Sequence, residues 1–324
     1  MSNFLENYGK TIFVLVLIAI LISWAHPLSI KIKEYTLAKV NNTDKIGTKE
    51  ITTTNGETVK SDEPTNAVDK IYCIYYTDGE LVIAQNQIEP ESGRTVDKQG
   101  FYSAPYNCTH YMTTVRFEGA VMPKSCYYWF YDCNNLTQIK NMESLYTNEC
   151  TTMYGMFYGC ASLTNIDISH FDTSKVTTMF NMFSTCRSLV NIDVSHFNTS
   201  HVTNMSNMFY YCDKLVNINL SSFNTENVTT MNMMFDECHS LTKLDLSSFN
   251  TENVTDMEQM FGYCENLVEV NTSESFLIQE NSNLKSMFLN CSNLKKFSCS
   301  EETKNKILNS KYRTYAYDKM FVCF

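Results

Sequence analysis

The chain has few of the residues that build catalytic loops. Its 324 residues include only 10 glycines and 5 prolines. It contains no glycine-rich phosphate loop, no Gly-x-Ser-x-Gly elbow and no His-Glu-x-x-His motif. Cys108 and His110 lie two residues apart, which is weak evidence for a nucleophile and its base. We therefore predict that the protein is not an enzyme and has no catalytic residue, cofactor-binding residue or metal site.

Positive charge is also scarce. The 25 lysines and arginines are outnumbered by 35 aspartates and glutamates, so the formal net charge is -10. Nucleic-acid binding requires basic patches, and the same residues are needed at an anionic membrane surface. The charge balance therefore argues against nucleic acid as a partner and restricts membrane contact to the N-terminal segment.

Residues 11–25 form an apolar run that carries no charge. The run is shorter than the roughly 20 residues of a spanning helix and suits a secretory signal. Extended to Leu28, it is long enough for a tilted anchor. Residues 1–28 are thus predicted to be either a signal peptide or an uncleaved N-terminal membrane anchor. No cysteine directly follows the run, so lipid attachment at a new N-terminus is not available.

One motif recurs through the second half of the chain. A Met-Phe pair followed by Cys returns every 26 residues, from Met156-Phe157-Cys160 to Met260-Phe261-Cys264. A fixed period of this length predicts a solenoid, in which each unit buries its apolar face against its neighbours. Worn copies on both sides extend the array to about seven units over residues 129–299.

Each unit combines two patterns. Leu163-x-x-Ile166-x-Ile168 is the spacing of a leucine-rich repeat strand, with apolar side chains inside and polar ones outside. Val176, Met179, Met182 and Phe183 are spaced to suit a helical or 3₁₀ turn behind the strand. The predicted fold class is an α/β-type leucine-rich repeat solenoid with parallel stacked short strands.

The repeat text Leu-x-x-Leu-Asp-Leu-Ser-x-Phe-x-Thr-x-x-Val-Thr-x-Met-x-x-Met-Phe-x-x-Cys resembles BspA-type leucine-rich repeat surface proteins, in the form also found in mycoplasma lipoprotein-type repeats. It covers a little over half of the chain. The resemblance implies an extracellular, bacterial-type surface protein associated with adhesion. It implies no catalytic site and supplies no functional residue for transfer to this sequence.

The segments outside the repeat have their own patterns. Residues 29–70 are polar and are predicted to be a stalk. Residues 71–128 are predicted to form a small β cap, beginning with a hairpin of residues 71–76 and 81–83 around Asp78-Gly79. Residues 300–324 are predicted to form a C-terminal cap, with Ser300 capping a short helix and a final strand at residues 319–324.

The chain contains 13 cysteines, of which seven occupy one fixed repeat position: Cys133, Cys160, Cys186, Cys212, Cys238, Cys264 and Cys291. We predict that these seven are buried, small apolar residues. Disulfides along the stack are the less favoured alternative. A bond between Cys299 and Cys323, or among Cys73, Cys108 and Cys126, remains open.

Polar side chains alternate with the buried ones along the predicted strands and form columns on the outer face of the sheet. The candidate partner-binding residues of this strand face are Asp167, Asp193, Asn217, Asn219, Lys243, Asp245, Glu269 and Asn271. Three interpretations stay open: a solvated face, a partner-binding face and a Ca²⁺ site, since stacked oxygens suit that ion. The change from Asn217 to Lys243 to Glu269 favours a binding patch at the C-terminal end.

Three functional hypotheses follow. The first is an exported protein, exposed at the cell surface, that binds a host or matrix protein or a glycan as a monomer. The second is a structural spacer or coat component with no specific ligand. The third, an enzyme, is the least favoured.

Overall fold

The computed structural model describes residues 50–52, 58–60, 67–102, 111–311 and 320–324. The chain divides into two compact units, Met1–Ser61 and Asp62–Phe324. In the first unit, β1 (Glu50–Thr52) pairs antiparallel with β2 (Thr58–Lys60). This pair lies in the segment predicted to be a polar stalk. The apolar run of residues 11–25 and Cys108 lie outside the described residues.

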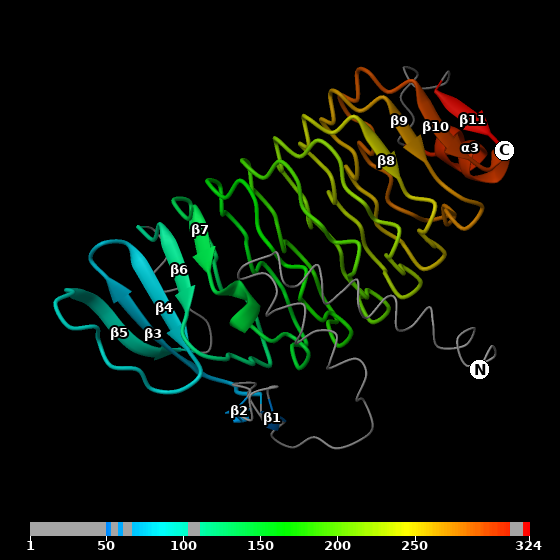
Figure 1. Cartoon of the computed structure of the whole chain (residues 1–324). Coiled ribbons are helices and arrows are strands. Elements are labelled where there is room, and N and C mark those ends of the chain that lie inside the picture. Colours follow the sequence, from blue (N-terminus) through cyan, green and yellow to red (C-terminus); the bar gives the residue numbers. More distant parts are fainter. Residues whose placement is uncertain (1–49, 53–57, 61–66, 103–110, 312–319) are drawn as a thin grey trace, which may run out of the picture. The chain divides into compact units, whose positions relative to one another are not determined.

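A five-stranded sheet forms the N-terminal part of the second unit. Its strands are β3 (Ile71–Tyr76), β4 (Glu80–Ala84), β5 (Val96–Tyr102), β6 (Thr114–Phe117) and β7 (Gln138–Lys140). They lie in the order β5-β3-β4-β6-β7 (Figure 1). The predicted hairpin is present as β3 and β4, with Gly79 at φ 90° and its N–H donating to the Tyr76 carbonyl at 3.0 Å.

The sheet changes from antiparallel to parallel as it meets the repeats. β3 pairs antiparallel with β4 and β5, whereas β6 pairs parallel with β4 and β7. Because β7 belongs to the first, degenerate repeat, the sheet includes a strand of the solenoid. That this sheet protects the first repeat's edge stays a prediction.

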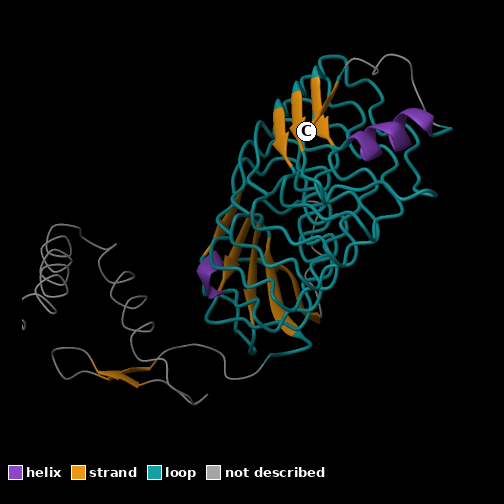
Figure 2. Cartoon of the chain, turned by 90° about the vertical axis from the view of Figure 1, so that its right-hand side faces the viewer, coloured by secondary structure: helices purple, strands orange, loops and turns teal. Residues whose placement is uncertain are grey.

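The solenoid consists mainly of stacked turns and extended segments, with the assigned strands gathered towards its two ends (Figure 2). Parallel bridges join equivalent residues of successive units: Thr178 with Asn204, Asn204 with Thr230, Thr230 with Asp256 and Asp256 with Asn283. These bridges place neighbouring repeats side by side in one register and confirm the solenoid. The extra residue before Asn283 is absorbed without loss of that register.

The helical or 3₁₀ turn predicted behind the strand is a different structure. Alternate N–H groups of the turn donate to carbonyls of the next unit: Asn181 N donates to Ser206 O at 3.1 Å and Phe183 N to Met208 O at 3.0 Å. The intervening Met182 N stays inside it, donating to Met179 O at 3.1 Å. A helix would use these N–H groups within one unit, whereas here half of them connect consecutive units. Asn181 and Thr185 adopt positive φ of 59° and 58° to permit this.

After β7 in the first repeat, regular strands of the repeat are assigned only towards its C-terminal end. β8 (Lys243–Asp245), β9 (Glu269–Asn271), β10 (Lys296–Cys299) and β11 (Phe321–Cys323) form a parallel sheet in chain order. In the earlier units the corresponding segments are joined by isolated, long hydrogen bonds, such as the one from Val190 N to Thr164 O at 3.3 Å. The predicted strands are therefore extended there without forming a continuous ladder.

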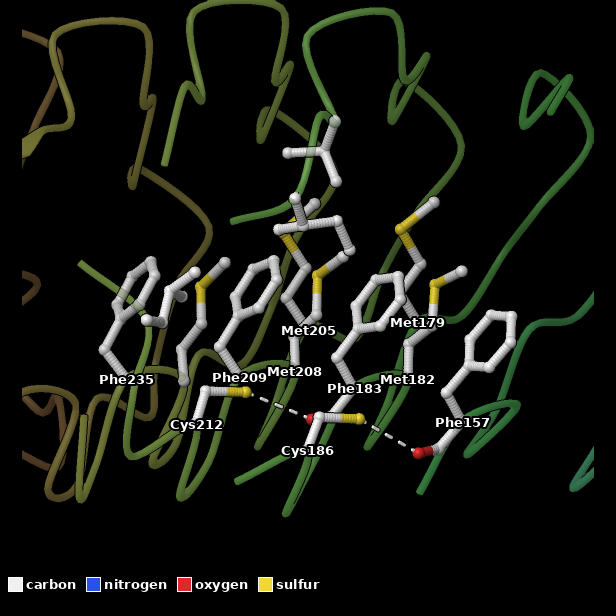
Figure 3. Close-up of a cluster of buried hydrophobic side chains, with 14 of the residues drawn as sticks. Phe157, Met179, Met182, Phe183, Cys186, Met205, Met208, Phe209, Cys212 and Phe235 are labelled. Carbon is white, nitrogen blue, oxygen red and sulfur yellow. Dashed lines mark hydrogen bonds between the residues drawn. The ribbon is translucent and has the colours of Figure 1, made fainter. Parts of the chain in front are cut away.

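The core is a set of side-chain columns running along the stack. Phe157, Phe183, Phe209 and Phe235 are buried, with successive ring centroids 5.5–5.7 Å apart and planes within 7° of parallel. Methionines from the same turns pack beside them (Figure 3). Since every unit supplies the same shapes, each fills the space that its neighbour leaves.

The described cysteines of the repeat position are all buried. From the second unit on, the thiol donates to a main-chain carbonyl one unit back: Cys186 Sγ to Phe157 O at 3.2 Å and Cys212 Sγ to Phe183 O at 3.2 Å (Figure 3). The same bond recurs from Cys160 to Cys291 at 2.8–3.3 Å. These thiols therefore point at carbonyl oxygens, and those of Cys133 and Cys160 also contact each other.

The C-terminal segment follows its prediction closely. A short helix, α3 (Glu301–Asn309), begins after Ser300, whose side chain accepts a hydrogen bond from Thr303 N at 3.1 Å. β11 then adds to the sheet beside β10, with Phe297 opposite Phe321. A short 3₁₀ helix, η2 (Met142–Ser144), lies in the first repeat.

Candidate functional site

The eight strand-face residues all lie at the surface. Glu269 and Asn271 are half-buried and the other six are exposed. The structure brings two pairs into register on β8 and β9: Lys243 opposite Glu269 and Asp245 opposite Asn271. The predicted face is therefore a real surface, whose residues make distinct local contacts.

The aspartate and asparagine column holds the turn that follows each strand. Asp167 Oδ1 accepts from Ser169 N at 3.1 Å and from Ser169 Oγ at 2.7 Å. Asp193 makes the same two bonds with Ser195, at 3.0 and 2.6 Å, and they hold the pKa of Asp193 below its usual value. Asn219 and Asp245 accept from the serine N–H two residues on. Side chains used in this way stabilise the repeat itself.

The charged residues at the C-terminal end neutralise one another. Glu269 pairs with Lys296 at 2.6 Å and with Lys243 at 3.3 Å. Both lysines keep the pKa of Glu269 below its usual value, Lys296 more strongly. Lys296 also donates to Asn271 Oδ1 at 3.1 Å. In the part of the chain that the structure describes, no group of three or more His, Cys, Asp or Glu side chains is arranged to hold a metal ion.

The strand face also carries two exposed apolar side chains. Val190 is 38% exposed and Val216 is 40% exposed, and each directly precedes an exposed asparagine, Asn191 or Asn217. The sequence signal was the Leu-Val-Asn text of two successive units. These valines extend the candidate surface towards the N-terminal repeats.

A second surface was missed in the sequence. Six aromatic rings on the turns of the first three units make contact with one another: Tyr127, Tyr128, Tyr131, Tyr154, Tyr158 and Phe180. We call this set the tyrosine cluster. Its ring centroids lie 4.5–5.2 Å apart. Tyr127 is 45% exposed and Tyr131 36% exposed, so the cluster presents ring surface to solvent.

A glycine makes room for the tyrosine cluster. Gly155 adopts φ 56°, and a Cβ there would lie 2.2 Å from Tyr128 Cε1. Later units carry Asn181 and Asn207 at this position, also at positive φ. The glycine is therefore required by the ring of Tyr128 rather than by the backbone conformation alone. Burial, and then the hydrogen bond with Tyr154, raise the pKa of Tyr128, which keeps its hydroxyl protonated.

Sequence comparison places the chain in a family. The family described as "Mycoplasma protein of unknown function, DUF285" matches residues 124–219 and 188–300, which together span more than half of the chain. The chain belongs to this family. The matched residues take in the solenoid and the tyrosine cluster, so both surfaces of this DUF285 protein lie in the part shared with its family.

Other comparisons add less. No curated protein matches the sequence. A leucine-rich repeat protein from Bacteroides ovatus, known from a crystal structure, is similar at 12% identity over 80% of this chain and 99% of its own, with a TM-score of 0.24. A likeness at this level supports no functional conclusion. Among the residues described, no helix is long and apolar enough to cross a membrane.

Proposed function

We propose that this DUF285 protein is an exported cell-surface protein of the BspA-like kind that binds an extracellular protein or glycan. Its repeats form an extended solenoid, an architecture that binds partners over broad surfaces. The apolar run of residues 11–25 supports export, as a signal peptide or an N-terminal anchor. The proposed partner is a host or matrix component, bound by a monomer.

The tyrosine cluster is the observation that carries this proposal. Tyrosine combines a large rigid ring with a hydroxyl, and exposed tyrosines are enriched where proteins bind partners. Aromatic residues clustered on one surface expose apolar area that a spacer does not need. The strand face is the second candidate surface, since its acidic and amide side chains already bond within the repeat.

Binding to an array of matrix proteins, mucins and glycans tests the proposal. A specific hit should weaken at least tenfold when Tyr127 and Tyr131 are both changed to serine, because two exposed anchoring side chains are lost. Tyr111→Ser is the matched control, as Tyr111 is 78% exposed and lies outside the tyrosine cluster. Lys243→Ala with Glu269→Ala tests the C-terminal strand face separately.

Each result has a defined meaning. Loss of binding in the Tyr127 and Tyr131 variant alone locates the site on the tyrosine cluster. Loss in the Lys243 and Glu269 variant alone moves the site to the strand face. A folded protein that binds nothing on the array would favour the alternative function, a structural spacer without a specific ligand.

A further inference from the structure

Two cysteines outside the repeat position are neighbours at the C-terminal end. Cys299 is the last residue of β10 and Cys323 the last of β11, and they are direct partners in the parallel pairing of these strands. Paired strands lie about 4.8 Å apart, which falls within the Cα separations that disulfides span. Cys299 is fully buried and Cys323 is half-buried.

This pair differs from the cysteines of the repeat position in exposure, because Cys323 is half-buried whereas the other described cysteines are buried. The thiols from Cys160 to Cys291 each donate to a main-chain carbonyl in the preceding unit. The side chains of Cys299 and Cys323 interact with each other, as those of Cys133 and Cys160 and those of Cys126 and Cys150 also do. The structure has both as free thiols. Their arrangement therefore already brings two sulfurs together at an edge of the sheet.

We propose that Cys299 and Cys323 form a redox-active pair that oxidises to a disulfide and fastens the terminal strand β11 to β10. The loop closed by this bond contains α3. β11 is three residues long, has one described neighbour in its sheet and is held mainly by Met320 and Phe321, which pack against the core. The proposal concerns this end of the molecule alone and does not depend on partner binding.

The reaction has two steps. The Cys323 thiolate, which solvent reaches, attacks an external disulfide and releases one thiol, giving a mixed disulfide on Cys323. The Cys299 thiolate then attacks the Cys323 sulfur and displaces the second external thiol. The two protons given up by Cys323 and Cys299 pass to the two external thiolates that are displaced, so the two electrons from the cysteine pair reduce the external disulfide to two thiols. Cys299 is too buried to accept the external disulfide itself.

Charges on α3 set the speed of the first step. Burial and then Glu301 raise the pKa of Cys323, whereas Lys304 lowers it. Burial raises the pKa of Cys299 to about 12. Because the thiolate is the attacking species, oxidation should accelerate about tenfold per pH unit between pH 7 and 8. Glu301→Gln should speed it, and Lys304→Gln should slow it.

The test uses the full-length, reduced protein and oxidised glutathione. After incubation at pH 8, free thiols are blocked with N-ethylmaleimide, and the protein is digested without reduction and analysed by mass spectrometry. The expected product is one linked pair of peptides carrying Cys299 and Cys323. The described cysteines of the repeat position should react only after unfolding. Cys299→Ser should accumulate glutathione on Cys323, whereas Cys323→Ser should form neither product.

The proposal is overturned if Cys299 and Cys323 are both recovered as maleimide adducts while a control dithiol peptide oxidises. It is equally overturned if the folded protein links other cysteines and leaves these two as thiols. Hydrogen exchange of residues 320–324 tests the fastening. Exchange should be slower in the oxidised than in the reduced protein and insensitive to oxidation in Cys323→Ser; equal exchange would remove the fastening role.

Discussion

The buried thiols of the repeat position show how one residue type satisfies two demands at once. The position is buried and lies beside a phenylalanine carbonyl of the preceding unit, which also accepts from the N–H of that unit's own cysteine. A cysteine fills the space and donates a weak S–H bond, for example from Cys238 to Phe209 O at 3.1 Å. Burial raises the pKa of Cys186, Cys212 and Cys238 well above the usual value. Such thiols are poor nucleophiles.

Asp236 is a buried carboxyl group without a cationic partner among the described residues. It is 3% exposed, and its Oδ1 has no hydrogen-bond partner. Burial, and then the charge of Glu237, raise the pKa of Asp236 to about 7. The next unit provides Gly262, where a Cβ would lie 2.3 Å from Asp236 Oδ1. The glycine therefore accommodates a carboxyl group that is costly to ionise.

Replacing Asp236 should change how stability depends on pH. The folded-state pKa lies above the unfolded value, so the native protein binds this proton more tightly. The resulting stability is full below about pH 4 and is lost as the pH rises through about 7. Asp236→Asn should therefore raise the unfolding free energy at pH 8. The increase in unfolding free energy on going from pH 8 to pH 5 should be smaller in this variant than in the native protein by about 1–3 kcal/mol. Urea titrations at both pH values measure this.

Asp193→Asn is the control for that prediction. The pKa of Asp193 is lowered by its bonds to Ser195, so its contribution has the opposite sign and is lost on acidification. In the Asp193→Asn variant, the increase in unfolding free energy from pH 8 to pH 5 should be as large as in the native protein or larger. If Asp236→Asn and the native protein show the same pH dependence, Asp236 is already ionised and solvated.

At the scale of elements, one carboxylate joins the N-terminal sheet to the first repeat. Glu80 on β4 pairs with Arg94 at 2.6 Å, with Lys140 on β7 at 3.1 Å and with Arg116 on β6 at 3.5 Å. Burial acts against ionisation, but these cations outweigh it and keep the pKa of Glu80 below its usual value. One side chain thus links three neighbouring strands.

Glu80→Gln should lower the unfolding free energy by about 1–3 kcal/mol, because three partly buried cations lose their shared carboxylate. The ionised carboxylate stabilises the fold above its unfolded pKa, so the difference should shrink as the pH falls through the folded pKa. Glu118→Gln is the control, since Glu118 is 50% exposed and, within the described ranges, pairs with Arg116 alone, at 3.1 Å. Thermal unfolding of both variants measures the effect. Equal melting temperatures would show that Glu80 contributes no more than a surface ion pair.

The elements that the sequence predicted well are those with local signals. Asp78-Gly79 indicated the first hairpin, and Ser300 before two glutamates indicated α3. The Met-x-x-Met-Phe turn was predicted as a helical or 3₁₀ turn because its apolar spacing suits either. Which carbonyl each N–H meets depends on the neighbouring unit, and a pattern within one unit does not contain that information.

The candidate site was harder to predict for a related reason. The strand face was found by alternation, but the bonds from Asp167 and Asp193 to following serines were not anticipated. The tyrosine cluster unites Tyr128 and Tyr154, which the chain separates by one repeat. Only the stacking distance brings such residues together, so no local motif indicates the surface.

At the scale of the whole solenoid, stability depends on contacts between successive units. A buried threonine column illustrates this: Thr173 Oγ1 donates to Asn198 O at 3.0 Å and accepts from Asn198 N at 2.8 Å. Thr199 donates to Asn224 O at 2.8 Å in the next unit. Since each interface repeats the one before it, the units are interchangeable in first approximation.

If the units are interchangeable, we expect that one whole repeat can be deleted without loss of the fold. Deleting residues 187–212 joins Cys186 to Asp213, which follows the equivalent Cys212, and so preserves the period of 26 residues. We expect a folded protein with one cooperative transition and a denaturant m-value lower by roughly a tenth, in proportion to the surface lost. The matched control deletes residues 187–206, which removes a similar length but places Asn207 where Asp213 belongs. Its phenylalanine, threonine and cysteine columns are shifted, so it should unfold at much lower denaturant or fail to fold. If the two deletions were equally stable, the register of the columns would not be what holds the solenoid together.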